Sequence, residues 1–438
     1  MGTVKARPSS NVHRLPVRSV PATRASHPFE VCLVAGICLL LAFGPLAFGA
    51  VQAWAICVLE TGAACLLLLW GAWQVSRPQP SIRVFPVFVP LALFGILIGA
   101  QLVFRLSAYW YETWSHALLF TAYGALFFLA SQCFSRTVHA MIFAVFFTFF
   151  GFGVALFAVA QEFASNGKIY WIVPNRNLGY VYGPYVNHAH YAGLMELLVP
   201  IPVVIAMGRL TARPIRLLFG FAALLMGASI FLSRSVGGMV AFSVEIGVLA
   251  VFLFRRKSKN RVWLLAALVA ALAISLALAR PAALIQRLSD IHHPMASGTE
   301  GLRVAIVKDS MGMIEQHPVV GWGLGTFPVI YPSFRSFYTN LFVNEAHNDF
   351  VQLLVETGIL GFSLILIFLF LTYWAGLRSV DHWRSEPRAA IVLAALVGCT
   401  GLLIHGLGDF NLQIPANAAI FSAIAAIAAT GNAPPLRS

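Results

Sequence analysis

A histidine at the start of an apolar segment late in the chain is the residue best suited to chemistry. His347 follows Glu345 and precedes Asn348 and Asp349, and an apolar run begins directly after them. An imidazole can accept a proton near neutral pH, so a histidine at the polar mouth of a membrane helix could activate a hydroxyl group. A lone histidine is more often structural, but this one stands beside carboxylates at a helix start. We therefore predict that His347 is the catalytic residue.

Two arginines are candidates for holding an anionic group. Arg234 lies between Ser233 and Ser235, with apolar runs on both sides and almost no loop around it, where a charge is costly. Arg303 lies about one turn into a helix expected within a long polar segment. The planar fork of an arginine matches phosphate oxygens bidentately, so the two side chains could bind a diphosphate. The alternatives are a snorkelling Arg234 at the interface and an Arg303 that is only a solvated surface charge.

A turn with the pattern Gly-x-Gly-x-Gly follows the second arginine. Its glycines, Gly321, Gly323 and Gly325, could let backbone N–H groups approach a phosphate closely. The spacing is not that of a dinucleotide-binding fingerprint, and no strand precedes the turn. The pattern alone therefore only suggests a backbone phosphate site.

Aromatic and amide side chains gather at the start of another apolar run, as they do beside the catalytic histidine. Sugars stack on rings and bond to amides, so we predict a glycan-binding surface made by His188, His190, Tyr185, Asn187 and Asn348. The alternative is the aromatic belt of a membrane interface. Two nearby histidines without a fixed third ligand do not make a metal site, so we expect no metal and no cofactor.

The composition requires a membrane environment. Of the 438 residues, 59% are hydrophobic and 10% are charged, whereas soluble proteins carry about a quarter charged residues. The net charge of +13 comes from basic residues clustered in short loops between apolar runs, which is the positive-inside pattern of membrane proteins and not a nucleic-acid groove. The six cysteines show no metal-ligand spacing.

We predict an all-α, polytopic membrane protein with about 12 transmembrane helices. A helix needs about 20 mainly apolar residues to cross the bilayer. The runs that satisfy this length are 29–49, 52–74, 84–104, 113–134, 138–160, 188–208, 217–233, 236–254, 262–279, 349–374, 390–408 and 412–430.

Alternation of these spans fixes the expected topology. It places twenty of the 29 Lys and Arg residues on the side of the N-terminal tail and nine on the other, so both termini are expected in the cytoplasm. Residues 1–28 should form a disordered basic tail and 29–438 a single transmembrane domain. The segment 280–348 becomes a large extracytoplasmic loop, and its part 301–316 is expected as a helix on the membrane surface. His347 and both arginines then face outward.

The segment Ala-His-Asn that contains His347 resembles the signature of the O-antigen ligase and polymerase superfamily. Arg234, Arg303 and His347 occur in the family's order over about residues 185–420, which also contain the similar Gly-Asp-Phe-Asn segment 408–411. The resemblance implies a bacterial inner-membrane enzyme that moves a glycan from undecaprenyl diphosphate to a sugar acceptor in the periplasm, with inversion and without metal. It also implies that the arginines hold the diphosphate and that the histidine activates the acceptor hydroxyl.

Several functions stay open from the sequence. A ligase would use the lipid A core as acceptor in lipopolysaccharide assembly, whereas a polymerase would use a growing polysaccharide chain, and a protein acceptor is a third choice. A transporter of the same lipid-linked glycan should carry paired charges within its spans. The intramembrane acids Glu60, Glu196 and Glu245 look few and unpaired, which favours the enzyme. A scaffold protein would leave Arg234 without a reason.

Overall fold

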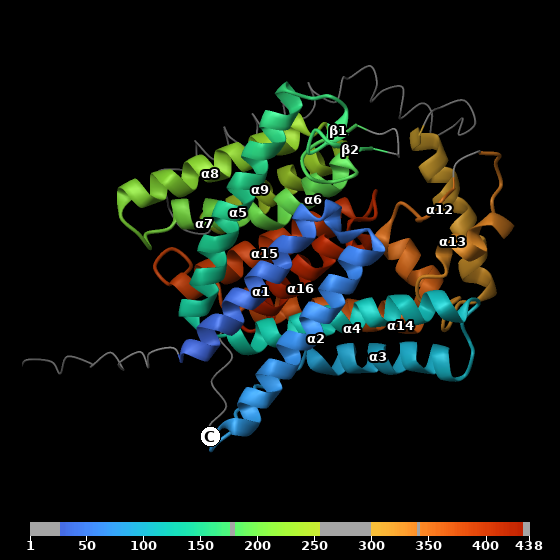
Figure 1. The fold of residues 1–438 in the computed structure, drawn as a ribbon, viewed down its shortest axis with the longest axis horizontal. Helices are drawn as coiled ribbons and strands as arrows, with labels where there is room; N and C mark the ends of the chain where they lie inside the picture. The colour runs from blue at the N-terminus through green and yellow to red at the C-terminus, as the bar shows by residue number, and fades with distance from the viewer. Residues whose placement is uncertain (1–26, 176–179, 255–298, 340–341, 432–438) are drawn as a thin grey trace, which may run out of the picture.

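The fold is built almost entirely from helices (Figure 1). The computed structural model describes residues 27–175, 180–254, 299–339 and 342–431. Within these residues nine helices are long and apolar enough to cross a membrane, and two shorter apolar helices accompany them. The prediction of an all-α polytopic membrane protein is therefore confirmed.

The helices fall into an N-terminal and a C-terminal group. The first group is α1 (Pro28–Leu46), α2 (Ala53–Ser76), α3 (Phe88–Val103), α4 (Trp110–Cys133), α5 (Thr137–Phe163), α6 (His188–Leu198), α7 (Pro200–Met207), α8 (Arg213–Leu232) and α9 (Val236–Phe254). The second group is α12 (Thr299–Gln316), α13 (Phe327–Ile330), α14 (Asp349–Leu377), α15 (Pro387–His405) and α16 (Pro415–Ala429). The short elements are η1 (Phe48–Ala50), β1 (Lys168–Ile169), β2 (Val173–Pro174), η2 (Tyr331–Ser333) and η3 (Asn411–Gln413). Strands β1 and β2 pair in antiparallel fashion.

The predicted spans correspond to these helices wherever the structure describes them. Only the expected span 262–279 lies wholly outside the described residues, as does much of the tail predicted over residues 1–28. One prediction needs refinement, because the single expected span 188–208 is two helices, α6 and α7. Pro200 and Pro202 cause the interruption, since a proline has no N–H to continue the ladder of the preceding turn.

The core of the fold lies around α6, α15 and α16. In these helices almost every side chain is buried, small alanines included, whereas α2 leaves most of its apolar side chains exposed. Figure 1 shows α15 and α16 in the middle of the molecule, with α1, α2 and α4 around them. The exposed apolar side chains of the outer helices suit a hydrocarbon environment. Because the outer helices surround the inner ones, the inner helices can contain polar groups.

Helix α14 is interrupted one third of the way along its length. Gly358 has φ 62°, and a Cβ at this position would come within 2.3 Å of the carbonyl oxygen of Val319. The N–H groups of Ile359 and Leu360 donate instead to Pro318 and Val319, at 2.8 and 3.2 Å. The chain segment before α13 therefore fills the gap in the helix, which only a glycine permits.

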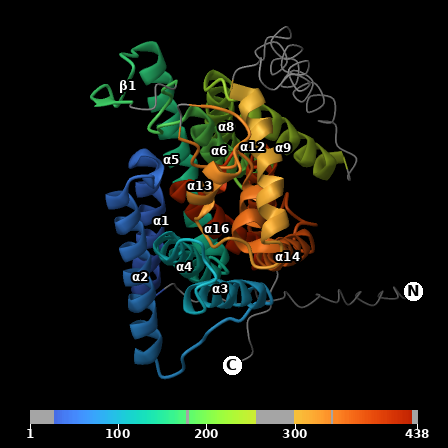
Figure 2. The ribbon, with the colours of Figure 1, turned by 90° about the vertical axis from the view of Figure 1, so that its right-hand side faces the viewer.

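Helix α12 packs against α14 and carries the second predicted arginine (Figure 2). Its buried side chains, Ile306, Ser310 and Met313, follow a helical spacing, and Ile306 and Met313 belong to a small separate core. Arg303 continues that same stripe, since it lies three residues before Ile306. The helix expected over 301–316 is present, but Arg303 points toward the protein and not along a solvated face. The location of α12 at the membrane surface stays a prediction.

Candidate functional site

A buried carboxylate, Asp409, is the centre of the most polar cluster among the described residues. It lies in the connection between α15 and α16, and its side chain is 4% exposed. The N–H of Phe410 donates to its Oδ1 at 2.9 Å. Side chains from three other segments of the chain face it, which places residues from the middle and the end of the sequence in one site.

His347 is one of these neighbours. Its Nδ1 lies 3.9 Å from Oδ1 of Asp409, and its side chain is 27% exposed. The residue has φ 51°, a left-handed conformation that is strained for a side chain other than glycine. Asn348 directly after it caps α14 by accepting from the N–H groups of Phe350 and Val351, each at 3.0 Å. The cap and the turn before it thus aim the imidazole at Asp409 and leave Nε2 for a substrate.

Arg303 faces the same carboxylate from α12. Its Nη2 lies 3.8 Å from Oδ2 of Asp409, and its Nη1 donates to the carbonyl oxygen of Gly408 at 3.1 Å. The side chain is 31% exposed. A guanidinium group has five N–H donors, so these contacts orient Arg303 and leave donors for an anion.

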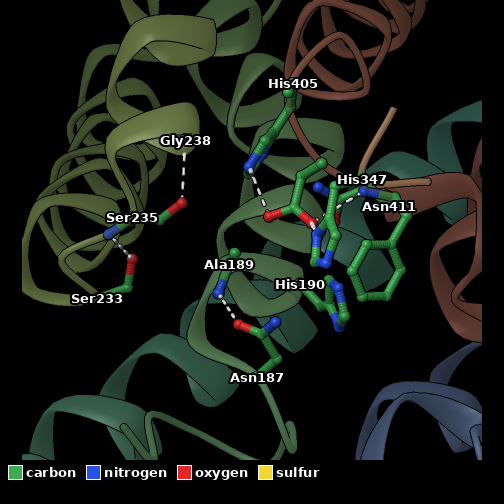
Figure 3. Close-up of polar contacts among 12 residues, drawn as sticks. Asn187, Ala189, His190, Ser233, Ser235, Gly238, His347, His405 and Asn411 are labelled. Carbon is green, nitrogen blue, oxygen red and sulfur yellow. Dashed lines mark hydrogen bonds and ion pairs between the residues drawn. The ribbon is translucent and has the colours of Figure 1, made fainter. Parts of the chain in front are cut away.

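An aromatic ring joins the site to α6. The ring of Phe410 lies between two imidazoles, with centroids 4.9 Å from His347 and 4.7 Å from His190, both edge-on. Figure 3 shows His190, His347 and His405 close to one another. The packing fixes the imidazole of His347 from the side opposite to its solvent edge.

The charges around Asp409 favour its ionised form. Burial opposes ionisation, but the neighbouring His347, His190 and Arg303 outweigh it and hold the pKa of Asp409 well below its usual range. Nearby Glu345 behaves in the opposite way, because its burial, together with the neighbouring acidic groups, raises the pKa of Glu345 to about 8. The site therefore combines a carboxyl group that is ionised at neutral pH, that of Asp409, with one that titrates near neutral pH, that of Glu345.

A second histidine contacts the other side of the carboxylate. His405, at the end of α15, has its Nε2 4.0 Å from Oδ2 of Asp409 and its Nδ1 2.8 Å from Oε1 of Glu196 on α6. The side chains of His405 and Glu196 are 1% and 0% exposed. The interpretation of Glu196 as an unpaired intramembrane acid was therefore wrong, and it no longer separates an enzyme from a transporter.

Arg234 lies apart from this cluster. Its Nη2 forms an ion pair with Oε1 of Glu162 at 3.2 Å, its guanidinium lies 4.7 Å from the ring centroid of Tyr180, and its side chain is 69% exposed. Like His347 it has a left-handed backbone, with φ 61°. Tyr180 contacts His188 edge-on, with ring centroids 5.6 Å apart. The two predicted arginines thus approach the site from different sides, and no contact joins them within the described residues.

The glycine turn has a different purpose from the predicted one. The N–H groups of Gly321, Gly323 and Gly325 donate to the carbonyl oxygens of His317 and Glu356 and to the carboxylate of Glu356, at 3.2, 3.0 and 2.8 Å. All three glycines have positive φ, and a Cβ on any of them would lie within 2.5 Å of a neighbouring atom. The prediction of a backbone phosphate turn is therefore corrected, because the amides already bind a carboxylate of the same chain.

The predicted glycan surface is only partly at the surface. Tyr185 is 1% exposed and donates its hydroxyl to Asn417 at 2.7 Å, and His190 is 5% exposed. Both belong to the core, which corrects their assignment to a glycan surface. Asn187 caps α6 at the N–H of Ala189, and Asn348 uses its amide for the cap and for the carbonyl oxygen of Leu407. Of this set, His188 is half-buried, and its ring packs edge-on against Tyr180.

Asp409, His405 and Glu196 were missed as site residues. The segment 408–411 was noted only for its likeness to a family motif. One signal was available, since His405 and Asp409 stand four residues apart around a helix end, a spacing that places two side chains on one face. The approach of Glu196 to His405 has no local signal, because it depends on how α6 packs against α15.

The chemistry of the cluster is that of a base, a carboxylate and a cation. Among the described residues, no group of three or more His, Cys, Asp or Glu side chains is arranged to hold a metal ion. A base supported by a carboxylate, beside an arginine, suits attack by a hydroxyl group on a centre that bears an anionic leaving group.

A family model matches the middle part of the chain. Residues 221–366 match the family model described as O-Antigen ligase. The matched segment contains Arg234, Arg303 and His347 and ends before Asp409. No curated protein matches the chain.

Proposed function

We propose that this multi-pass membrane protein, whose residues 221–366 match the O-Antigen ligase family model, transfers a glycan from undecaprenyl diphosphate to a sugar acceptor. The acceptor we propose is the lipid A core, as in a ligase of lipopolysaccharide assembly. Transfer to a growing polysaccharide, as in a polymerase, is the alternative that the same site would support.

The reaction we propose is a single displacement at the anomeric carbon. The acceptor oxygen forms a bond to that carbon while its proton passes to Nε2 of His347. The bond from the carbon to the phosphate oxygen breaks, and its electron pair leaves with the diphosphate. The configuration at the carbon is inverted. Asp409, 3.9 Å from Nδ1, stabilises the imidazolium that forms.

The arginines supply the positive charge for the leaving group. Arg303 is held by Gly408 and Asp409 at the edge of the cluster, with further N–H donors available to a phosphate. Arg234 would exchange Glu162 for the second phosphate, because a diphosphate carries more charge than one carboxylate. The two groups together neutralise the leaving group, so we propose that the reaction needs no metal.

The distribution of arginines supports a periplasmic site. Alternation assigns three arginines near the turn between α4 and α5 to the cytoplasm. Arg136 lies in this turn, and Arg83 and Arg388 hydrogen-bond to it. Helix α15 runs from Arg388 near its start to His405 at its end, roughly 28 Å at 1.5 Å per residue. The basic end and the site thus lie a membrane thickness apart, which supports an inner-membrane protein with cytoplasmic termini.

One observation carries the proposal: Asp409 faces both His347 and Arg303, at 3.9 and 3.8 Å. The test is transfer by the purified protein in liposomes that contain undecaprenyl-diphosphate glycan, with lipid A core or a carrier-linked repeat as acceptor. We expect product on the lipid A core, also in EDTA. Product only on the carrier-linked repeat would assign the polymerase reaction. Loss of transfer in EDTA, restored by magnesium, would overturn the metal-free mechanism.

A transporter predicts a different outcome in the same liposomes. The lipid-linked glycan would change leaflet without any new glycosidic bond. Movement of the donor with no product on either acceptor would therefore overturn the enzyme proposal.

A further inference from the structure

A buried ion pair within the membrane domain lies directly behind the proposed site. His405 donates from Nδ1 to Oε1 of Glu196 at 2.8 Å, and both side chains are essentially inaccessible. Ionisable groups inside a membrane bundle are expensive, and pairing them recovers only part of that cost. An apolar pair of similar size would pack here at less expense, so the pair calls for a role beyond packing.

Two glycines on α9 make room for the pair. A Cβ at Gly237 would come within 2.6 Å of Nε2 of His405, and a Cβ at Gly238 within 3.2 Å of Oε1 of Glu196. Farther along the same helix, a Cβ at Gly247 would meet nothing within 4 Å. The close approach of α9 is therefore local to the pair, and it limits the positions that the imidazole of His405 can occupy.

The pair faces the carboxylate that serves the catalytic histidine. Oδ2 of Asp409 lies 4.0 Å from Nε2 of His405, and its Oδ1 lies 3.9 Å from Nδ1 of His347. Nε2 of His405 has no hydrogen-bond partner among the described side chains and backbone, so Asp409 is the polar group it faces. Each oxygen of one carboxylate thus faces a different imidazole, one buried and one exposed to substrate.

We propose that Glu196 and His405 form a positioning pair that holds Asp409 so that its Oδ1 faces His347. Glu196 fixes the ring of His405 through Nδ1, and the ring presents its Nε2 edge to Asp409 from the membrane side. The pair touches no substrate and acts only through Asp409. This inference rests on the proposed function, because it gives the pair a role in the same reaction.

The role predicts a specific coupling between variants. Glu196→Gln keeps the size of the side chain and removes its charge, so the hydrogen bond to Nδ1 of His405 is no longer charge-assisted and holds the ring less firmly. We expect kcat to fall about 10-fold while KM for the lipid-linked donor stays within about twofold, a size typical of residues coupled in one network. In an Asp409→Asn background the same substitution should cause no further loss of kcat, because the group through which it acts is gone.

Glu245→Gln is the matched control. Glu245 is a second buried carboxylate of the bundle, on α9, and neither of its oxygens has a hydrogen-bond partner among the described residues. We expect this variant to keep kcat near that of the parent protein. Equal losses from Glu196→Gln and Glu245→Gln, or losses that add to that of Asp409→Asn, would show that the pair only stabilises the fold and would overturn the proposal.

A second pair of variants tests the geometry without removing a charge. Gly237→Ala places a methyl group against His405, whereas Gly247→Ala adds the same group in open space on the same helix. We expect the first to lower kcat about 10-fold and the second to leave it unchanged, with both proteins recovered folded from the membrane. If Glu196→Gln does not fold, the comparison of Gly237→Ala with Gly247→Ala still tests the positioning pair. A Gly237→Ala variant with full kcat would overturn the proposal.

The failure of this inference and that of the proposed function look different. If His347→Ala retains transfer, the catalytic proposal itself falls. If His347→Ala is inactive while Glu196→Gln and Gly237→Ala both keep full kcat, the catalytic proposal stands and only the positioning pair is rejected.

Discussion

The two ends of helix α15 use arginine in opposite ways. At its start, the half-buried Arg388 donates to the carbonyl oxygens of Phe134, Ile427 and Gly431 and to the hydroxyl of Thr430. Beyond its end, Arg303 has one hydrogen bond to the described residues, at Gly408, and a carboxylate at 3.8 Å. The guanidinium of Arg388 donates to three parts of the protein, whereas that of Arg303 is held at one edge only.

The difference separates a structural arginine from one that can bind a ligand. Arg388 connects the turn after α4 with α15 and with the end of α16. Its N–H donors are therefore occupied by main-chain carbonyl groups. Arg303 keeps donors beside a histidine that has a strained backbone, and strain of this kind persists where surrounding contacts hold it in place. Substitutions at the two ends should therefore change different quantities.

The largest effect is expected at the histidine. His347→Ala should lower kcat about 10²- to 10⁴-fold, because it removes the group that accepts the acceptor proton. The measurement is single-turnover transfer in liposomes, with protein amount and melting temperature as controls. His347→Gln separates two roles, since glutamine can orient a hydroxyl but cannot take its proton. Retention of most activity by the glutamine variant would make His347 an orienting group.

The next effect tests the comparison of the two arginines. Arg303→Ala should weaken use of the lipid-diphosphate donor by roughly 30- to 1000-fold in kcat/KM, as for loss of a charge-assisted contact. Arg303→Lys should restore little, because lysine lacks the planar fork. Steady-state kinetics against donor concentration give the answer.

Arg388→Ala is the control for that experiment. Its loss leaves buried carbonyl groups without a donor, so we expect it to lower stability by about 1–3 kcal/mol per unsatisfied group and to spare kcat/KM of the folded fraction. If Arg388→Ala abolishes transfer at normal stability, or Arg303→Ala lowers only the melting temperature, the distinction between the two ends is wrong.

A smaller effect, and a pH dependence, are expected at the carboxylate. Asp409→Asn should lower kcat about 10- to 100-fold, because the imidazolium formed during transfer loses its counter-charge. The measurement is single-turnover transfer over a range of pH. The pH–kcat profile is best measured in a Glu345→Gln background. Burial raises the pKa of Glu345 to about 8, so its titration would otherwise appear in the same profile.

The same substitution should change stability in a defined pH window. The pKa of Asp409 is lower in the folded protein than its usual value, so its ionised form stabilises the fold above that usual value. This contribution is lost as the pH falls through the folded pKa. Asp409→Asn should therefore melt lower at neutral pH, with the difference shrinking in strong acid. A profile and a melting curve that match those of the parent protein would separate Asp409 from His347.

The smallest effect is expected at Glu162, the ion-pair partner of Arg234. This ion pair is largely exposed, and such pairs are worth about 0.2–1 kcal/mol. If Glu162 only holds the guanidinium until the diphosphate arrives, Glu162→Gln should lower KM for the donor about twofold to fivefold. Donor titration at constant acceptor measures it, and a higher KM would mean that Glu162 orients Arg234 for binding.

The helices were predictable and most of the contacts between them were not. Apolar runs of the right length predict spans because the bilayer imposes that length, and they located the described helices closely. His347, Arg303 and Arg234 stood out because polar residues at the ends of apolar runs are unusual. Asp409 and Glu196 did not, because their partners come from segments joined only by helix packing.

The glycine turn shows a second limit. Glycines at alternate positions indicate close approach of the backbone to something, but the pattern does not say to what. Here the approaching group is Glu356, which lies 31 residues beyond Gly325 in the same chain. A carboxylate and a phosphate both accept from backbone N–H groups, so the sequence pattern is the same for either partner.

The interruption of α14 at Gly358 has a consequence for the biogenesis of the protein. The segment Ile359–Leu377 alone is roughly 28 Å long as a helix, enough to cross the hydrocarbon layer. The insertion machinery therefore needs to partition only this apolar part into lipid. Asp349, Gln352 and Glu356, on the turns before the glycine, can be translocated as polar chain, and Glu356 can fold later against the segment 318–326. One helix in the finished protein is thus delivered to the membrane as two pieces.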